Sequence, residues 1–261
     1  MIKGSRMMMK HGAPTPSVPT ARDYVLTGLI AMWDGIENAG FGAHSGNTLV
    51  WKNLGSLGSA YDATRLAQAQ AWTDNGAVFH LGSVDYVFQI PGWFLRDEMG
   101  AEWSYELVFT PDEKWVQGAG YSGIFGNHGS GKGIVGGQCN GDYSYVSFNL
   151  YDPEVVLWLP VISESFSLGQ IASVSQAASN SSHSATTWKD GVTVSSVGSV
   201  DVELTYRLEG TSIGSAYERK QGEGHRTFDG IIHCVRIYNR PITAAEIAAN
   251  YAIDKARFNL P

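Results

Sequence analysis

The sequence predicts an all-β protein, an antiparallel sandwich of short strands closed by one short C-terminal helix. Turn signals recur roughly every ten residues, without the alternation of strands and helices that a parallel sheet requires. Glycine is abundant, at 31 of 261 residues, charged residues make up only 16%, and 8 Trp, 12 Tyr and 10 Phe are spread along the chain. This composition is typical of a β-sandwich with many turns. The length allows one large all-β domain or two small ones.

The stretch 228–258 carries the clearest local signals. Residues 231–238 are β-branched and aromatic, as expected of a strand that is buried on at least one face. The apolar positions Ile232, Val235 and Ile237 do not keep one parity along this strand. We therefore expect a β-bulge between Ile232 and Val235.

A helix follows this strand. Thr243 is followed three residues later by Glu246, which is a capping box and predicts a helix that begins at Ala244. Ile242 and Ile247 are placed as the hydrophobic staple around the box. Because this is one amphipathic helix after many strands, we expect it to pack as a plug on the end or edge of the sheets.

Residues 1–22 differ in composition from the rest of the chain. They contain four basic residues, no acidic residue and three prolines. This pattern predicts an extended basic tail or linker, followed by one sandwich domain at 23–261. Two interpretations stay open. In the first, the tail anchors the chain on a protein partner, and an acidic partner would suit its basic residues. In the second, the tail is a leader without a partner.

Charge and hydropathy exclude several classes of function. The formal net charge of -7 argues against binding to nucleic acid through phosphate contacts and suits neutral ligands or cations. The first residues lack the apolar segment of a secretory signal peptide, and no segment approaches the roughly 18 apolar residues of a membrane helix. We expect synthesis in the cytoplasm, no membrane insertion, and export, if any, by a non-classical route such as virion assembly or lysis.

The first half of the chain contains several strand signals. Residues 24–33 are apolar and predict a first strand, and the Gly-, Asn- and His-rich residues 34–47 predict a long loop. Residues 78–87 predict a strand, a turn and a second strand. Residues 105–109 alternate between apolar and polar side chains, which indicates a half-buried strand.

The second half continues this pattern. Residues 170–197 predict strands on both sides of a turn at 180–183. The pair Asp190 and Gly191 is a strong signal for a hairpin with a two-residue turn. Residues 202–206 alternate again and predict another strand.

A candidate ligand surface lies between residues 143 and 151. Apolar side chains alternate there with a row of aromatic and polar ones. The members of this row are Tyr145, Ser147, Asn149 and Tyr151. Rings that cover the apolar side of a pyranose, beside groups that meet its hydroxyls, are what a sugar-binding face needs. We expect Trp115, Tyr121 and His128 to lie nearby; the alternative is a solvent-exposed strand face of high β propensity.

Three segments carry a resemblance to a known family. They are the closing segment 228–251, the segment 79–87 with Gly82, Asp85 and Tyr86, and the hairpin 188–192. Together with 28–33 as the opening strand, they resemble the laminin-G-like, concanavalin A-like jelly-roll superfamily, particularly its bacterial and phage modules, over about residues 24–258. The resemblance implies a two-sheet antiparallel jelly-roll β-sandwich whose first and last strands lie side by side. It also implies a non-catalytic carbohydrate-binding or adhesion module.

No cofactor is expected. Members of this family that hold calcium place an acidic residue in the loop that corresponds to 127–137, and this loop contains no carboxylate. Cys139 and Cys234 are 95 positions apart and match no metal or redox spacing, so we expect two buried thiols. The seven histidines show no zinc spacing.

Glycosidases of this superfamily resemble one another in carrying two acidic residues on alternate positions of one strand and a third nearby. Glu102 and Glu106 are four positions apart, and Asp201 with Glu203 lacks the third acid. We therefore expect no enzyme, and no catalytic residues. The interpretation favoured by the sequence is a non-catalytic glycan-binding module of a surface or virion protein. A structural assembly protein, such as a phage tail decoration held by the tail at 1–22, is the alternative, and a glycan-cleaving enzyme is the remote one.

Overall fold

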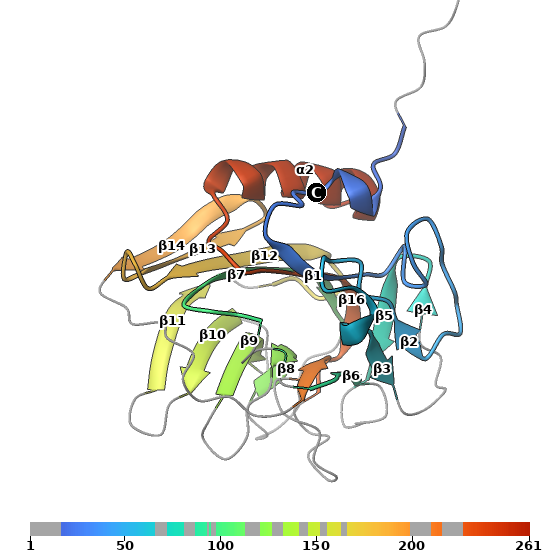
Figure 1. The fold of residues 1–261 in the computed structure, drawn as a ribbon, viewed down its shortest axis with the longest axis horizontal. Helices are drawn as coiled ribbons and strands as arrows, with labels where there is room; N and C mark the ends of the chain where they lie inside the picture. Colours follow the sequence, from blue (N-terminus) through green and yellow to red (C-terminus); the bar gives the residue numbers. More distant parts are fainter. Residues whose placement is uncertain are drawn as a thin grey trace, which may run out of the picture.

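The computed structural model describes residues 17–65, 72–80, 87–92, 94, 98–112, 121–126, 133–140, 146–151, 156–162, 166–198, 210–215 and 227–261. These residues form two antiparallel sheets with a single α-helix at the C-terminal end of the chain (Figure 1). The predicted all-β sandwich with one C-terminal helix is confirmed.

The first sheet has the strand order β14-β13-β12-β7-β16-β5-β4, and β1 pairs with β16. Its strands are β1 (Leu29–Asp34), β4 (Trp72–Thr73), β5 (Gly76–Phe79), β7 (Glu102–Pro111), β12 (Ala172–Ser179), β13 (Ser184–Lys189), β14 (Val192–Gly198) and β16 (Gly230–Tyr238). β16 is central: β7 lies on one side of it, and β5 and then β1 lie along the other. The side-by-side position of the first and last strands is therefore confirmed.

The second sheet has the order β11-β10-β9-β8-β15-β6-β3-β2. Its strands are β2 (Val50–Trp51), β3 (Ala63–Arg65), β6 (Phe88–Ile90), β8 (Tyr121–Gly126), β9 (Gly133–Asn140), β10 (Val146–Tyr151), β11 (Val156–Ile162) and β15 (Thr211–Ile213). The prediction of two strands within 78–87 is tested only in part, because residues 81–86 lie outside the described residues. β5 ends at Phe79 in the first sheet, and the next described strand, β6, begins at Phe88 in the second.

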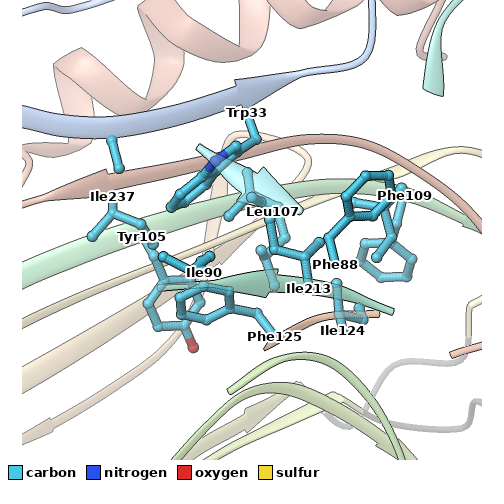
Figure 2. Packing of buried hydrophobic residues seen from close by; sticks show 14 of the residues in the cluster. Trp33, Phe88, Ile90, Tyr105, Leu107, Phe109, Ile124, Phe125, Ile213 and Ile237 are labelled. Atoms are coloured by element: carbon cyan, nitrogen blue, oxygen red, sulfur yellow. The ribbon is translucent and has the colours of Figure 1, made fainter. Parts of the chain in front are cut away.

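The core lies between the two sheets. Figure 2 shows Trp33 and Leu107 from the first sheet packed toward Phe88, Ile124 and Phe125 from the second. All five side chains are buried. Their apolar area, removed from water, is the main stabilising term of the sandwich.

The N-terminal boundary differs in detail from the prediction. Thr20 caps a short 3₁₀ helix, η1 (Ala21–Asp23), and Ala21 is fully buried. Tyr24, predicted to start the first strand, instead precedes a turn closed by a hydrogen bond from Leu29 N–H to the carbonyl of Leu26. The residues from Thr20 onward thus pack with the sandwich, and the division at residue 22 stays a prediction.

Two local predictions near the C-terminus are confirmed. The pairing of β16 with β7 shifts register between Ile232 and Cys234, which is the expected β-bulge. The hairpin between β13 and β14 turns at Asp190 and Gly191, whose φ angles are 50° and 76°. Gly191 also lacks a side chain where the ring of Tyr251 lies, because a Cβ at this position would approach that ring to 2.8 Å.

The C-terminal helix α2 (Ala244–Phe258) begins at the predicted residue. Thr243 Oγ1 accepts a hydrogen bond from Glu246 N–H (3.3 Å), and Glu246 Oε2 accepts one from Thr243 N–H (2.8 Å). The predicted position of α2 is wrong: it lies across the outer face of the first sheet, not at an end or edge (Figure 1). Its buried side carries apolar residues, Ile247 and Phe258, which pack on that face, and polar and charged residues that find partners there.

The capping box gives a first testable prediction. Replacing Thr243 with alanine removes the side-chain acceptor for the free N–H groups of the first turn, so the free energy of unfolding is expected to fall by about 1 kcal/mol. Chemical denaturation would measure this change. Thr243→Ser keeps the hydroxyl and is expected to stay close to the wild type; an equal loss in both variants would contradict the role of the cap.

Candidate functional site

The predicted ligand row falls on the second sheet, which is the sheet opposite α2. β10 lies between β9 and β11, and β8 lies on the far side of β9. Asn149 pairs with Val135 of β9 and with Trp158 of β11. Tyr151 pairs with Gly133 and Val156 at the end of the strand.

The spacing along β10 is interrupted. The register with β9 shifts between Ser147 and Asn149, and the register with β11 shifts between Val146 and Phe148. Such an irregularity breaks the two-residue alternation on which the row was predicted. Asn149 and Tyr151 lie on the regular side of it and keep their alternation.

Of the other predicted site residues, one lies in a described strand and the rest lie outside the described residues. Tyr121 opens β8 and pairs with Asn140 of β9, so its backbone belongs to the same sheet as the row. Trp115, His128 and Tyr145 lie outside the described residues, as do Asp201 and Glu203. Whether these side chains gather at one place stays a prediction.

A buried ionic cluster lies under α2 on the outer face of the first sheet, beside a buried apolar cluster. Arg236 of β16 donates from Nε to Glu106 of β7 (2.7 Å) and from both terminal nitrogens to Asp254 of α2 (2.7 and 2.6 Å). Asn250 of α2 donates a further hydrogen bond to Glu106 (2.8 Å), and Tyr24 donates one to Asp254 (2.7 Å). All five side chains are buried, so the charges depend on one another rather than on water.

A second cluster holds the end of the helix. Arg257 donates two hydrogen bonds to Asp34 of β1 (2.6 and 3.1 Å) and one to Glu37 (3.0 Å). The ring of Tyr24 lies between the clusters, 4.2 Å from the guanidinium carbon of Arg236 and 5.3 Å from that of Arg257. The aromatic ring separates two cations while its face attracts both. The N-terminal segment, β1, β7, β16 and α2 are thereby joined.

Burial dominates the titration of these carboxyls. It raises the pKa of Glu106, against the lowering effect of Arg236, and it raises the pKa of Asp34, against that of Arg257. An acid with a raised pKa in the folded state binds its proton more tightly there than in the unfolded chain. The tighter proton binding stabilises the fold at low pH, and this stabilisation is lost as pH rises through the raised pKa. Both acids face the helix, where a sugar does not reach.

The carboxyls of Glu102 and Glu106 therefore lie in different surroundings. Glu106 is buried under α2, whereas Glu102 begins β7 and accepts hydrogen bonds from Ser179 Oγ (3.0 Å) and Ser181 N–H (2.9 Å). Burial opposes the ionised form of Glu102, but the hydrogen bonds from Ser181 and Ser179 outweigh it, and its pKa is lowered. The two carboxyls do not flank one bond.

In the part of the chain that the structure describes, no three His, Cys, Asp or Glu side chains gather as they would around a metal ion. None of the helices in these ranges is long and apolar enough to span a bilayer. Cys234 is a free, buried thiol, and burial raises its pKa.

Sequence reasoning missed the ionic clusters, although a signal exists. Arg236 is a charge within the apolar run 231–238. Asn250 and Asp254 fall at helical spacing between Ile247 and Phe258, on the stripe expected to be apolar. A charge on each of two predicted buried faces indicates an ion pair between them, because burying either charge alone is costly.

Comparisons with known proteins find similar folds in solved structures of low sequence identity. No family model matches the sequence, and no curated protein matches it in sequence. Trypanosoma rangeli sialidase in complex with 2,3-difluorosialic acid, a covalent intermediate, matches with a TM-score of 0.58 and 18% identity over 94% of this chain and 35% of the sialidase. The chain thus corresponds to about a third of the length of that enzyme.

Two further solved structures are similar. A mutant of the Trypanosoma rangeli sialidase that displays trans-sialidase activity has a TM-score of 0.58 and 19% identity, over 92% of this chain and 34% of its own. Domain 4 of a GH43 extracellular arabinanase from Geobacillus stearothermophilus, in complex with arabinotriose, has a TM-score of 0.51 and 16% identity. That match covers 86% of this chain and 98% of the arabinanase domain.

These similarities show a β-sandwich fold and correct the functional expectation. A non-catalytic adhesion module, an assembly protein and the absence of any enzyme were favoured by the sequence, and these predictions are wrong. The similar proteins are sialidases and a domain of an arabinanase. Local spacing of acids did not indicate a similarity to such proteins, because it tests only for a catalytic pair on one strand.

Proposed function

We propose that this chain recognises a neutral glycan as the β-sandwich domain of a glycan-cleaving enzyme, through the second sheet. The observation that carries the proposal is the similarity of nearly the whole chain to one part of a sialidase and to a complete arabinanase domain crystallised with arabinotriose. We also assign the sandwich to the laminin-G-like, concanavalin A-like type, on the closing strand, turn and helix at 228–258.

The choice of sheet rests on what covers the other one. α2 and the N-terminal segment lie over the outer face of the first sheet, and the charged side chains there bind one another. α2 does not lie over the second sheet, and that sheet carries the backbone of Tyr121, Asn149 and Tyr151. An aromatic ring beside an amide suits a sugar, because one covers its apolar face and the other meets its hydroxyls.

The choice of a neutral glycan rests on charge. With a formal net charge of -7, the chain repels anions at a distance, which disfavours sialic acid and leaves neutral sugars such as arabino-oligosaccharides unaffected. The carboxyls of the two ionic clusters are occupied, so the groups that cleave the glycan are to be sought outside these clusters, including in the remainder of a longer enzyme.

Calorimetric titration of the full chain with arabinotriose and with sialyllactose tests this proposal. We expect saturable binding of arabinotriose and weaker or no binding of sialyllactose. Tyr151→Ala and Asn149→Ala are expected to weaken binding, by roughly 1–3 kcal/mol for a removed buried contact. Phe41→Ala is the matched control, because Phe41 is an exposed ring, 39% accessible, in a loop that follows β1 of the first sheet. A folded chain that binds neither glycan would overturn the proposal.

A further inference from the structure

β16 changes its neighbour at His233. One side of β16 pairs with β7 along its whole length. The other side pairs with β5 as far as Ile232 and with β1 from Cys234 onward, and the β-bulge of β16 lies between these two residues. We call the junction between β1 and the β4–β5 hairpin, at His233, the seam. The hairpin lies at one end of the first sheet (Figure 1).

Hydrogen bonds of His233 close the seam from both sides. Its carbonyl accepts a hydrogen bond from the N–H of Gly35 (2.8 Å), the residue that follows β1. Its ring donates from Nδ1 to the carbonyl of Asn75 (2.9 Å), which lies in the turn of the β4–β5 hairpin. The hydroxyl of Thr110 on β7 donates to Nε2 (2.8 Å). A ring that donates at one nitrogen and accepts at the other is a neutral imidazole, so the closed seam holds His233 without charge.

Two glycines let the backbones meet at the seam. A Cβ at Gly35 would lie 2.6 Å from the carbonyl oxygen of Asn75. A Cβ at Gly76 would lie 2.9 Å from Nδ1 of His233. Real Cβ atoms essentially never approach other atoms this closely, so the closed seam has no room for a side chain at either position. His233 itself is only 3% exposed, and water does not solvate a charge on its ring.

The surroundings of His233 disfavour a charge on its ring. Burial opposes the protonated form, and this effect outweighs the hydrogen bond to Asn75 and the charge of Asp254, which favour it. Asp254 is already paired with Arg236. The other charged or titratable side chains on the elements packed against His233 are Asp34 of β1, Glu106 of β7, Asp74 of the hairpin turn and Arg257 of α2. The first two acids are paired with arginines, and the third is exposed to water.

The turn of the hairpin is the part of the seam that can open alone. β4 has two residues and is an edge strand of the first sheet among the described strands. Both residues of β4 and Asn75 of the turn are half-buried, whereas Ala77 and Phe79 of β5 are fully buried. Segments with few buried contacts open at a lower free energy than central strands do. Opening is therefore expected at residues 72–76, while β5 beyond them stays in the sheet.

We propose that the seam is an acid-operated latch: neutral His233 holds the hairpin turn on β16, and protonation of its ring releases the turn while the two sheets stay folded. In the released state the ring reaches water. The pKa of His233 is about 4 in the closed seam, and its ordinary value of 6.5 returns when the seam opens. The closed state is therefore fully favoured above pH 6.5, and this preference is lost as pH falls toward 4.

Hydrogen exchange of the full chain at pH 7 and pH 5, read by mass spectrometry, tests the latch. The two pKa values predict that the opening constant of the turn rises about 20-fold between these pH values. The protection factors of the amides in 72–76 are expected to fall by this factor and to stay below those of β12 at both pH values. Protection factors already correct for the effect of pH on the exchange chemistry. If the turn and β12 share one protection factor at pH 5, only global unfolding exposes the turn and the latch is refuted.

A pair of histidine variants assigns the pH dependence to the seam. In His233→Gln, the carboxamide can still donate to the carbonyl of Asn75 but does not titrate. The protection factors of the turn are therefore expected to be equal at pH 7 and pH 5. His183→Asn is the matched control, because His183 is exposed in the turn between β12 and β13, and asparagine tolerates its φ of 47°. This control is expected to keep the fall of the wild type; the same fall in His233→Gln would overturn the proposal.

Gly35→Ala provides a second measurement that does not depend on titration. The added methyl group would collide with the carbonyl of Asn75, so the turn is expected to be poorly protected already at pH 7 and to change little at pH 5. Unchanged protection of the turn at pH 7 in this variant would contradict the closed seam.

Discussion

Replacing Arg236 with methionine is expected to lower the free energy of unfolding by about 3–5 kcal/mol, as found when one partner of a buried ion pair is removed. Arg236 is fully buried and is the cation for both Glu106 and Asp254. Without it, two carboxyls stay buried with hydrogen bonds from Asn250, Tyr238 and Tyr24 but with no cation. The helix would then lose one of its ionic attachments to the first sheet.

Arg240→Met is the matched control for this experiment. Arg240 also pairs with a glutamate, at 2.6 Å from Glu246, but both side chains are 27% exposed. Water screens such a pair, so its loss is expected to cost about 1 kcal/mol or less. Denaturation in guanidinium would compare the two variants. Adding Glu106→Gln and Asp254→Asn to the Arg236 variant should recover stability; equal losses at Arg236 and Arg240 would refute the importance of the cluster.

Acidification is expected to destabilise the protein through His233. Burial lowers the pKa of His233 from 6.5 to about 4, because the loss of water penalises the charged imidazole more than the hydrogen bond to Asn75 and the charge of Asp254 favour it. Nδ1 donates to the carbonyl of Asn75 (2.9 Å), and the hydroxyl of Thr110 donates to Nε2 (2.8 Å). Since the unfolded chain takes up this proton first, the contribution is complete above pH 6.5 and is lost as pH falls toward 4. The loss amounts to about 3 kcal/mol.

A comparison of the wild type with a His233 variant separates the effect of His233 on stability from the effects of the acidic groups. Glu106 and Asp34 have raised pKa values, so they act in the opposite direction and partly mask His233 in the wild type alone. The free energy of unfolding should therefore be measured for the wild type and for His233→Gln between pH 8 and pH 4. The advantage of the wild type is expected to be constant above pH 6.5 and to shrink by about 3 kcal/mol below it. A constant difference across the whole range would contradict the assignment.

The confirmed predictions concern features encoded over a few neighbouring residues. The start of α2 follows from the capping box of Thr243 and Glu246, and the turn at Asp190 and Gly191 follows from their tolerance of positive φ. The bulge in β16 follows from the broken parity of Ile232 and Val235. Each feature is stabilised by contacts close in sequence, so the local pattern is sufficient.

The candidate site was predictable only in part. The alternation in 143–151 located a strand, and β10 covers residues 146–151. The register shifts around Ser147 were not predictable, because they depend on how β9 and β11 pair with this strand.

By itself, the sequence determined that this protein is an antiparallel β-sandwich, where its final strand ends and where its helix begins, because periodicity, turns and caps are local. The tertiary structure alone decided that α2 covers the first sheet through Arg236, Asp254 and Arg257. A charged residue looks exposed in a sequence. Only the fold supplies the opposite charge that permits its burial.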